Sequence, residues 1–322
     1  GETEDKPVTE MLTNSVSAFE LFVTGSYMGE FKNDWEKAAD YLEQAVKDDP
    51  VFAFAWFSLA NVYIQLNQGE NAEKAIRMAM QHDYKLSEKD KFETKYIYYF
   101  LFKQDPDMVF TLAKRRVELF PEDIEGHEWL ADAYRNKNQL DEAISEYERI
   151  LELDPEQYDN LQMIAQIYGD KGEFDKALEY HKQYANKYPD EPKSFTAIGA
   201  LHKTLGDFEQ AKASYKRALV IEPENISVLI TLADIESSLG NFDQALEQYM
   251  DALEVSKTPN QRMNVYYSLR YYYEMRGQLN KAIDCIQRAK AEGEKFQAPI
   301  QMLMTNMNSL ETYINAGKQD LA

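Results

Sequence analysis

The 322-residue chain carries a formal net charge of −21, and 44% of its residues are hydrophobic. This charge argues against non-specific binding to nucleic acid or to an anionic membrane. It fits either a solvated acidic surface that keeps the chain soluble or the attraction of a basic partner. The single cysteine, Cys285, excludes an intramolecular disulfide and leaves the redox compartment open. There is no run of about 18 apolar residues, so no segment is predicted to span or insert into a membrane.

The N-terminal part of the chain passes from a polar tail into a helical pattern. Residues 1–14 are rich in acidic side chains and contain Pro7, so we expect a tail or linker. From Ser15 onward apolar residues recur at helical spacing, beginning with Val16 and Phe19. A second stripe follows and ends before Pro50. The sequence therefore predicts a pair of helices directly after the tail.

The clearest periodicity lies between Ile124 and Asn225, where three consecutive units share one register of 34 residues. Each unit has a large, a small and a large residue in its first half, then a small and a large residue, then proline. These positions are Leu130, Ala131, Tyr134, Ala143, Tyr147 and Pro155; Ile164, Ala165, Tyr168, Ala177, His181 and Pro189; and Ile198, Gly199, His202, Ala211, Tyr215 and Pro223. Large residues four apart stack on one helix face, and the small residue leaves room where a second helix crosses. Proline ends that second helix, so each unit is predicted to be an antiparallel helix pair.

The pattern extends in both directions with two irregularities. Upstream, Trp56, Leu59 and Tyr63 occupy the large positions of an earlier unit. The register then shifts by three residues at 87–89, where Ser87 and Asp90 are expected to cap a new helix. The second helix of that divergent unit is expected to begin at Asp105-Pro106. A second three-residue shift occurs at 260–262.

A 34-residue period with this order of small and large residues resembles the tetratricopeptide repeat family. The resemblance implies an all-α, right-handed superhelical solenoid of about eight helix pairs plus a C-terminal capping helix. We expect a repeat array from 15 to 296, a capping helix at 297–317 and a tail at 318–322. The expected repeats are 19–52, 53–86, 90–123, 124–157, 158–191, 192–225, 226–259 and 263–296.

The first third of the chain also resembles a narrower group. The segments Leu12–Gly25, Asp49–Trp56 and Leu86–Asp90 are similar to the repeat regions of multidomain bacterial regulators of the adenylate cyclase, Ser/Thr kinase and winged-helix types. In those proteins the repeat region follows an effector domain. The resemblance implies that this chain is a piece of a larger protein.

Binding in this family, the resemblance implies, uses a concave face lined by the first helix of each repeat. Further positions on that face are Glu125, Lys193, Lys203 and Asp234. The predicted ligand-binding residues are Tyr27, Phe54, Phe57, Asn61, Lys91, Tyr98, Glu128, Asp132, Arg135, Gln162, Gln166, Tyr267 and Tyr271. Exposed aromatic side chains in a groove are plausible anchors for a peptide. The alternative is that Phe54, Phe57 and Tyr98 pack between adjacent repeats.

The chemistry of the expected ligand follows from two observations. Family members that grip a C-terminal carboxylate carry lysine at the fifth repeat position, but here Phe57 and Glu128 occupy it. The acidic group of Glu125, Glu128 and Asp132 favours a basic or neutral protein or peptide over an acidic one. The aromatic runs 96–102 and 271–273 leave a homodimer open as an alternative.

No arrangement of residues predicts catalysis, a metal site or a cofactor. The four histidines fall in four different repeats, and there is no CxxC motif, phosphate-binding glycine loop or GxSxG motif. Cys285 is expected to be a packed, inert thiol. Two interpretations remain. One is a non-catalytic interaction scaffold that forms part of a bacterial regulator, and the other is a regulatory or sensor domain acting on its own attached effector. The scaffold is expected in the cytoplasm, or in the periplasm as part of a membrane-anchored regulator.

Overall fold

The computed structural model describes residues 13–296 and 312–318, and in these residues the regular structure is entirely helical. The chain divides into two compact units between Asn160 and Leu161. In the first unit the helices are α2 (Val16–Glu30), α3 (Trp35–Asp48), α4 (Ala53–Gln65), α5 (Gly69–Gln81), η1 (Asp83–Lys85), α6 (Glu88–Ile97), η2 (Tyr98–Lys103), α7 (Pro106–Leu119), α8 (Ile124–Asn136) and α9 (Leu140–Leu153). Helix α10 (Asp159–Asp170) spans the boundary, and the second unit continues with α11 (Phe174–Lys187), α12 (Pro192–Thr204), α13 (Phe208–Ile221), α14 (Ile226–Ser238), α15 (Phe242–Val255), α16 (Pro259–Met275) and α17 (Leu279–Phe296).

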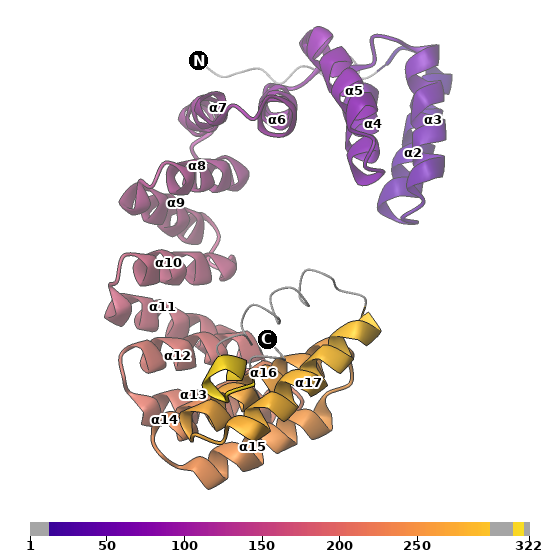
Figure 1. The fold of residues 1–322 in the computed structure, drawn as a ribbon. Helices are drawn as coiled ribbons and strands as arrows, with labels where there is room; N and C mark the ends of the chain where they lie inside the picture. The colour runs from indigo at the N-terminus through magenta and orange to yellow at the C-terminus, as the bar shows by residue number, and fades with distance from the viewer. Residues whose placement is uncertain (1–12, 297–311, 319–322) are drawn as a thin grey trace. The chain divides into compact units, whose positions relative to one another are not determined.

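These helices follow one another as eight pairs, which confirms the all-α repeat fold within the described residues. Helices α2 and α3, α4 and α5, and α8 and α9 pack side by side, as do α12 and α13, α14 and α15, and α16 and α17 (Figure 1). None of the described helices is long and apolar enough to cross a lipid bilayer. We call the first helix of each pair its A helix and the second its B helix.

The turn inside each pair contains one residue with a left-handed backbone. These residues are Asn33, Asn67, Gln104, Asn138, Gly172, Gly206, Gly240 and Gly277. Each lies 34 residues after the one before it, except Gln104 and Gly277, which lie 37 residues after theirs. Those two longer intervals contain the three-residue shifts in the sequence. Asparagine and glycine adopt this conformation at the least cost, so the turn is encoded locally.

Local sequence signals also set where the helices begin and end. Ser87 and Asp90 form a reciprocal capping box at the start of α6, as predicted. Asp105 caps α7, and Pro106 follows in the first turn. Helix α9 ends at Leu153, two residues before Pro155.

Small residues at the crossing points allow the two helices of a pair to approach closely. Ala131 in α8 and Ala143 in α9 are both completely buried. In the second unit the same position is Gly199, and a β-carbon built there would lie 3.0 Å from the Tyr215 ring. That distance is shorter than ordinary van der Waals contact, so the glycine admits the tyrosine.

The A helix of the third pair is irregular. Helix α6 ends at Ile97, and a π-helical segment, η2, follows it directly. Tyr98 packs against the hydrophobic core of the first two pairs, whereas Tyr96 and Phe100 stack on each other at 5.6 Å. Residues two positions apart lie on different sides of a helix, so Tyr98 and the stacked rings of Tyr96 and Phe100 point in different directions.

Residues 297–311 of the expected capping helix lie outside the described residues, but part of its end can be placed. Tyr313 is buried against Ile283 and Ile286 of α17. The Thr312 hydroxyl donates a hydrogen bond to Glu274 of α16. The described end of the segment therefore covers apolar surface of the last pair.

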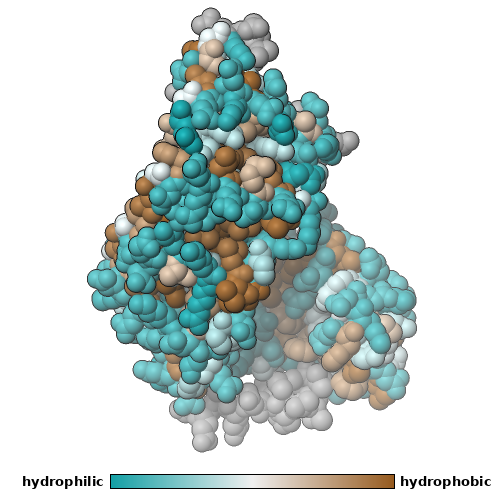
Figure 2. Space-filling view, turned by 90° about the horizontal axis from the view of Figure 1, so that it is seen from below, coloured by the Kyte–Doolittle hydropathy of each residue, from teal (hydrophilic) through white to brown (hydrophobic). Residues whose placement is uncertain are grey.

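The surface of the molecule is mostly hydrophilic, but some large apolar side chains remain exposed on it. In the space-filling view hydrophilic residues cover most of the visible face, with hydrophobic patches between them (Figure 2). Tyr271 is among the large apolar side chains that stay exposed, at 59%. Such side chains are candidates for contact with another molecule.

Candidate functional site

The A helices of the third and fourth pairs bring aromatic and acidic side chains together. The Tyr96 and Trp129 rings stack with their centroids 4.0 Å apart. The guanidinium carbon of Arg116 lies over the Trp129 ring, 4.1 Å from its centroid. This stack joins α6, α7 and α8 into one surface. The surface also carries Glu93, Glu125, Glu128 and Asp132, and we call it the acidic face.

Burial and like charges make the acidic face electrostatically strained. Burial raises the pKa of Glu128, and the neighbouring carboxylates Glu125 and Asp132 raise it further. Burial also raises the pKa of Glu93, again with Glu125 acting in the same direction. Crowded carboxylates of this kind are costly to keep ionised. A cation placed among them would relieve that cost.

Arg116 organises one side of this face. The residue is only 2% exposed, and its guanidinium donates hydrogen bonds to Asp123 at 2.6 Å and to Glu125 at 2.5 Å. A buried arginine paired with two carboxylates fixes their positions. The charge of Glu125 is therefore partly compensated, whereas Glu128 has no ion pair among the described residues.

Asp132 is held from the neighbouring B helix. The Tyr147 hydroxyl of α9 donates a 2.9 Å hydrogen bond to Asp132, and burial of this phenol raises its pKa to about 12. Arg135 lies one turn further along α8, 3.7 Å from the Asp132 carboxylate. Three predicted residues, Glu128, Asp132 and Arg135, thus share one stretch of α8.

A second site lies on the A helices of the other unit. A pocket of about 370 Å³ between α14 and α16 is lined by Asp234, Ser237, Ser238, Tyr249, Tyr267, Ser268, Arg270, Tyr271 and Met275. The predicted residues Tyr267 and Tyr271 therefore meet Asp234 in one cavity. We call this cavity the Asp234 pocket.

The polar groups of the Asp234 pocket are unevenly satisfied. Burial raises the pKa of the Asp234 carboxyl, while a hydrogen bond from the Tyr249 hydroxyl and the charge of Lys203 act in the opposite direction. The Ser237 hydroxyl is buried and has no hydrogen-bond partner in the described part of the chain. A ligand with hydrogen-bond donors and a positive charge would satisfy these groups.

The remaining predicted residues are spread over other surfaces. Phe57 is only 5% exposed and belongs to the core of the first two pairs, so the alternative of packing between repeats describes it. Phe54 and Tyr98 are half-buried against the same core. Tyr98 also has Lys103 and Arg77 over its ring, at 5.1 and 5.6 Å.

The other predicted ligand-binding residues lie outside the acidic face and the Asp234 pocket. Tyr27 is exposed and stacks on Phe31 at 5.5 Å, and Lys91 is paired with Glu88. Asn61 lines a smaller pocket of about 190 Å³ between α2 and α4. Gln162 is half-buried and Gln166 exposed on α10, and neither lines the Asp234 pocket.

Sequence reasoning missed the aromatic stack and the tyrosines that support the acidic residues. Tyr147 and Tyr249 each follow the aspartate they contact by 15 residues, which was a readable signal. The contacts of Tyr96 and Trp129 gave no such signal because they cross from one repeat to the next.

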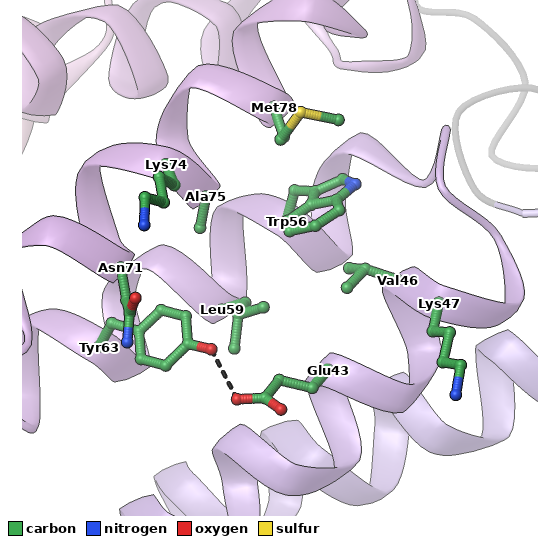
Figure 3. Close-up of a pocket in the computed structure, with 10 residues that line it drawn as sticks. All are labelled: Glu43, Val46, Lys47, Trp56, Leu59, Tyr63, Asn71, Lys74, Ala75 and Met78. Carbon is green, nitrogen blue, oxygen red and sulfur yellow. Dashed lines mark hydrogen bonds between the residues drawn. The ribbon is translucent and has the colours of Figure 1, made fainter.

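Sequence reasoning also missed a pocket on the B-helix side of the first two pairs. About 410 Å³ of space lies between α3, α4 and α5, lined by Glu43, Val46, Lys47, Trp56, Leu59, Tyr63, Asn71, Lys74, Ala75 and Met78. The Tyr63 hydroxyl donates a 2.6 Å hydrogen bond to Glu43 across this space (Figure 3). We call it the Trp56 pocket.

The cysteine and His127, residue types that often act in catalysis, are buried in this fold. Cys285 is buried, and burial raises the pKa of its thiol to about 11, which disfavours the nucleophilic thiolate. His127 is buried, with one ring nitrogen 2.5 Å from Glu146 and the other 3.1 Å from the Pro121 carbonyl. Within the described residues, no group of three or more histidine, cysteine or acidic side chains is placed to hold a metal ion.

The chain is similar to several solved structures, and two of them, with a TM-score of at least 0.50, support the fold. The chain is similar to yeast Tom70 at 15% identity and a TM-score of 0.57, over 95% of this chain and 66% of that one. It is similar to a tetratricopeptide repeat protein from Parabacteroides merdae at 14% identity and a TM-score of 0.50, over 91% of this chain and all of that one. The match to MamA has 22% identity and a TM-score of 0.44, over 52% of this chain and 96% of that one. No curated protein matches the chain.

The family itself is shown by direct matches to the sequence. Models described as tetratricopeptide repeat match residues 31–82, 124–157, 158–185 and 204–263, which together make up more than half of the chain. The matched residues lie in both units and agree with the helix pairs observed there. The chain therefore belongs to the tetratricopeptide repeat family.

Proposed function

We propose that the chain is a non-catalytic interaction scaffold that binds a basic segment of a partner protein on its A-helix surfaces. The observation that carries the proposal is the crowding of Glu93, Glu125, Glu128 and Asp132 around the stacked rings of Tyr96 and Trp129. Lysine and arginine side chains combine a charge for the carboxylates with an apolar stem for the rings. That the scaffold acts inside a larger bacterial regulator stays a prediction from the sequence.

The Asp234 pocket supports the same ligand chemistry in the second unit. It combines a carboxylate whose pKa is raised by burial with the side chains of Tyr267 and Tyr271. An ammonium or guanidinium group entering it would pair with Asp234 and contact the aromatic rings. Each unit thus offers its own position for a basic side chain.

The test uses a library of immobilised nine-residue peptides with a central phenylalanine, leucine, tyrosine or serine. Every flanking position is lysine, glutamate or serine. The full chain should retain peptides enriched in lysine. Because reversing a charge inside the cluster replaces attraction by repulsion, Glu128→Lys should reduce that retention roughly ten-fold. Asp234→Asn should reduce the part that depends on the second unit.

Glu247→Lys is the matched control, since it makes the same charge change at an exposed position on the B helix α15. It should leave the lysine-rich peptides bound. Retention that falls equally in Glu128→Lys and Glu247→Lys would mean that net charge alone attracts the peptides. That result, or an absence of lysine enrichment, would refute the proposal.

A further inference from the structure

The Trp56 pocket has the form of a side-chain binding site. Its base is formed by Leu59 and Ala75, which are buried, and its walls by Trp56 and Met78, which are half-buried. A volume of about 410 Å³ falls within the range of ligand-binding clefts. The space can take an aromatic or branched aliphatic side chain together with part of its backbone.

This pocket is formed by α3, α4 and α5, whereas the acidic face of the same unit is formed by α6, α7 and α8. Trp56, Leu59 and Tyr63 follow one another on one face of α4. Phe54 precedes Trp56 by two residues, which is roughly 200° around an α-helix. The other walls come from the B helices α3 and α5. The pocket shares no lining residue with the acidic face, so a segment bound here would leave the acidic face free.

The charges around the pocket are arranged differently from those of the acidic face. Lys47 and Lys74 are exposed on opposite sides of it (Figure 3), and neither has an ion-pair partner among the described residues. Glu43 is the one acidic residue in the described lining, and its carboxylate already accepts the Tyr63 hydroxyl. Burial, together with that hydrogen bond, raises the pKa of Tyr63, so the phenol remains a donor.

Two unpaired lysines beside an apolar cavity complement a ligand that carries carboxylates next to an apolar side chain. Lysine ammonium groups sit on flexible four-carbon stems, so they can reach carboxylates on either side of a bound residue. The indole Nε1 of Trp56 donates to the Pro50 carbonyl at 2.9 Å, which holds the ring in the wall of the pocket. A preorganised wall of this kind lowers the entropic cost of binding.

We propose that the Trp56 pocket is a second binding site, specific for an acidic peptide segment of a partner protein. An aromatic or branched aliphatic residue of the segment enters between Trp56, Leu59 and Met78, and flanking glutamates or aspartates pair with Lys47 and Lys74. The site differs from the proposed A-helix surface in both place and charge, and it stands independently of that proposal.

The same peptide library tests this site, because it contains glutamate-rich members with different central residues. The wild-type chain should retain peptides with a central phenylalanine or leucine between glutamates. Lys47→Glu/Lys74→Glu should lose at least roughly ten-fold of that retention, and the wild-type binding should weaken as salt rises. Both lysines are exposed, so the circular dichroism and melting temperature should not change.

Two control variants distinguish binding in the pocket from a general effect of net charge. Lys114→Glu/Lys85→Glu makes the same change in net charge outside the pocket lining and should keep the glutamate-rich peptides. Glu128→Lys should also keep them, while its retention of the lysine-rich peptides falls roughly ten-fold. Loss of both peptide classes in Lys47→Glu/Lys74→Glu would show that the substitutions act on the whole chain and would overturn the proposal.

Three further results would also refute it. A wild-type chain that retains no glutamate-rich peptide has no such site. Equal retention of phenylalanine- and serine-centred peptides would mean that the cavity is not entered. Sedimentation should show no self-association that depends on Lys47 and Lys74, because such association would make a second copy of the chain the occupant.

Discussion

The hydroxyl of Tyr147 in α9 donates a hydrogen bond to the carboxylate of Asp132 in α8 at 2.9 Å, so a B helix holds an acidic residue on the A-helix surface. The same relationship recurs in the second unit, where Tyr249 of α15 donates to Asp234 of α14. Both tyrosine side chains are almost completely buried. In each case a tyrosine packed in the core of a repeat therefore positions the aspartate that the repeat presents on its A-helix surface.

Removing either hydroxyl should cost stability and weaken the binding of basic peptides. Tyr147→Phe and Tyr249→Phe should each lower the free energy of unfolding by about 0.5–1.5 kcal/mol, because a buried tyrosine loses its hydrogen bond to a carboxylate, which is exposed in Asp132 and half-buried in Asp234. Urea denaturation gives this number. Tyr215→Phe is the control, since no described residue hydrogen-bonds to that hydroxyl. A loss as large in Tyr215→Phe would show that the hydrogen bonds are not the cause.

Two glycines in A helices should respond oppositely to alanine. Gly199→Ala places a methyl group 3.0 Å from the buried Tyr215 ring and should destabilise the chain by about 1–3 kcal/mol. Gly169 in α10 has open space around its Cα, so Gly169→Ala should stabilise by about 0.5–1 kcal/mol through helix propensity. Thermal unfolding of the two variants compares them. A stabilising Gly199→Ala would show that the ring can move aside.

Gln104 is the one left-handed turn residue of the eight described pairs that is neither asparagine nor glycine, with φ at 50°. Gln104→Gly should raise the free energy of unfolding by about 0.5–1 kcal/mol, since the side chain no longer opposes that backbone conformation. The corresponding change at Asn138, Asn138→Gly, should have a smaller effect because asparagine tolerates this region. Urea denaturation of both variants measures the difference, and equal effects at the two positions would argue against backbone strain at Gln104.

His181 should make the second unit sensitive to acid. Burial lowers its pKa below the ordinary value of 6.5, and its Nδ1 has no hydrogen-bond partner among the described residues. The folded state disfavours the protonated ring, so the unfolded chain takes up the proton first as pH falls. The free energy of unfolding should therefore be at its full value above pH 6.5 and should decrease as pH falls below 6.5. His181→Phe should remove that part of the pH dependence.

The comparison is made by urea denaturation at about pH 7.5 and about pH 5.5, on either side of the ordinary histidine pKa. The stability lost between the two values should be smaller for His181→Phe than for the wild-type chain. His82→Phe serves as the control, because His82 lies outside the second unit. An identical loss in wild-type and His181→Phe chains would show that other groups cause the acid response.

The helix pairs, their register and most of their boundaries can be predicted from the amino-acid sequence alone. Large and small residues repeat every 34 positions, Asn or Gly marks most turns, and residues such as Ser87 and Pro106 start helices. These signals act over a few residues along the chain, so they can be read without knowing what packs nearby.

Which side chains are buried, paired or gathered into pockets depends on how the repeats pack and could not be predicted from the pattern. Phe57 and Tyr271 were both predicted to line the concave face from their A helices, yet Phe57 is in the core and Tyr271 is exposed. The Trp129 stack needs Tyr96, and the Trp56 pocket needs side chains from α3 and α5. Such contacts join residues of different repeats, and their exposure and charge depend on how neighbouring repeats fit together. That fit is a property of packed surfaces, which a repeating pattern constrains but does not specify.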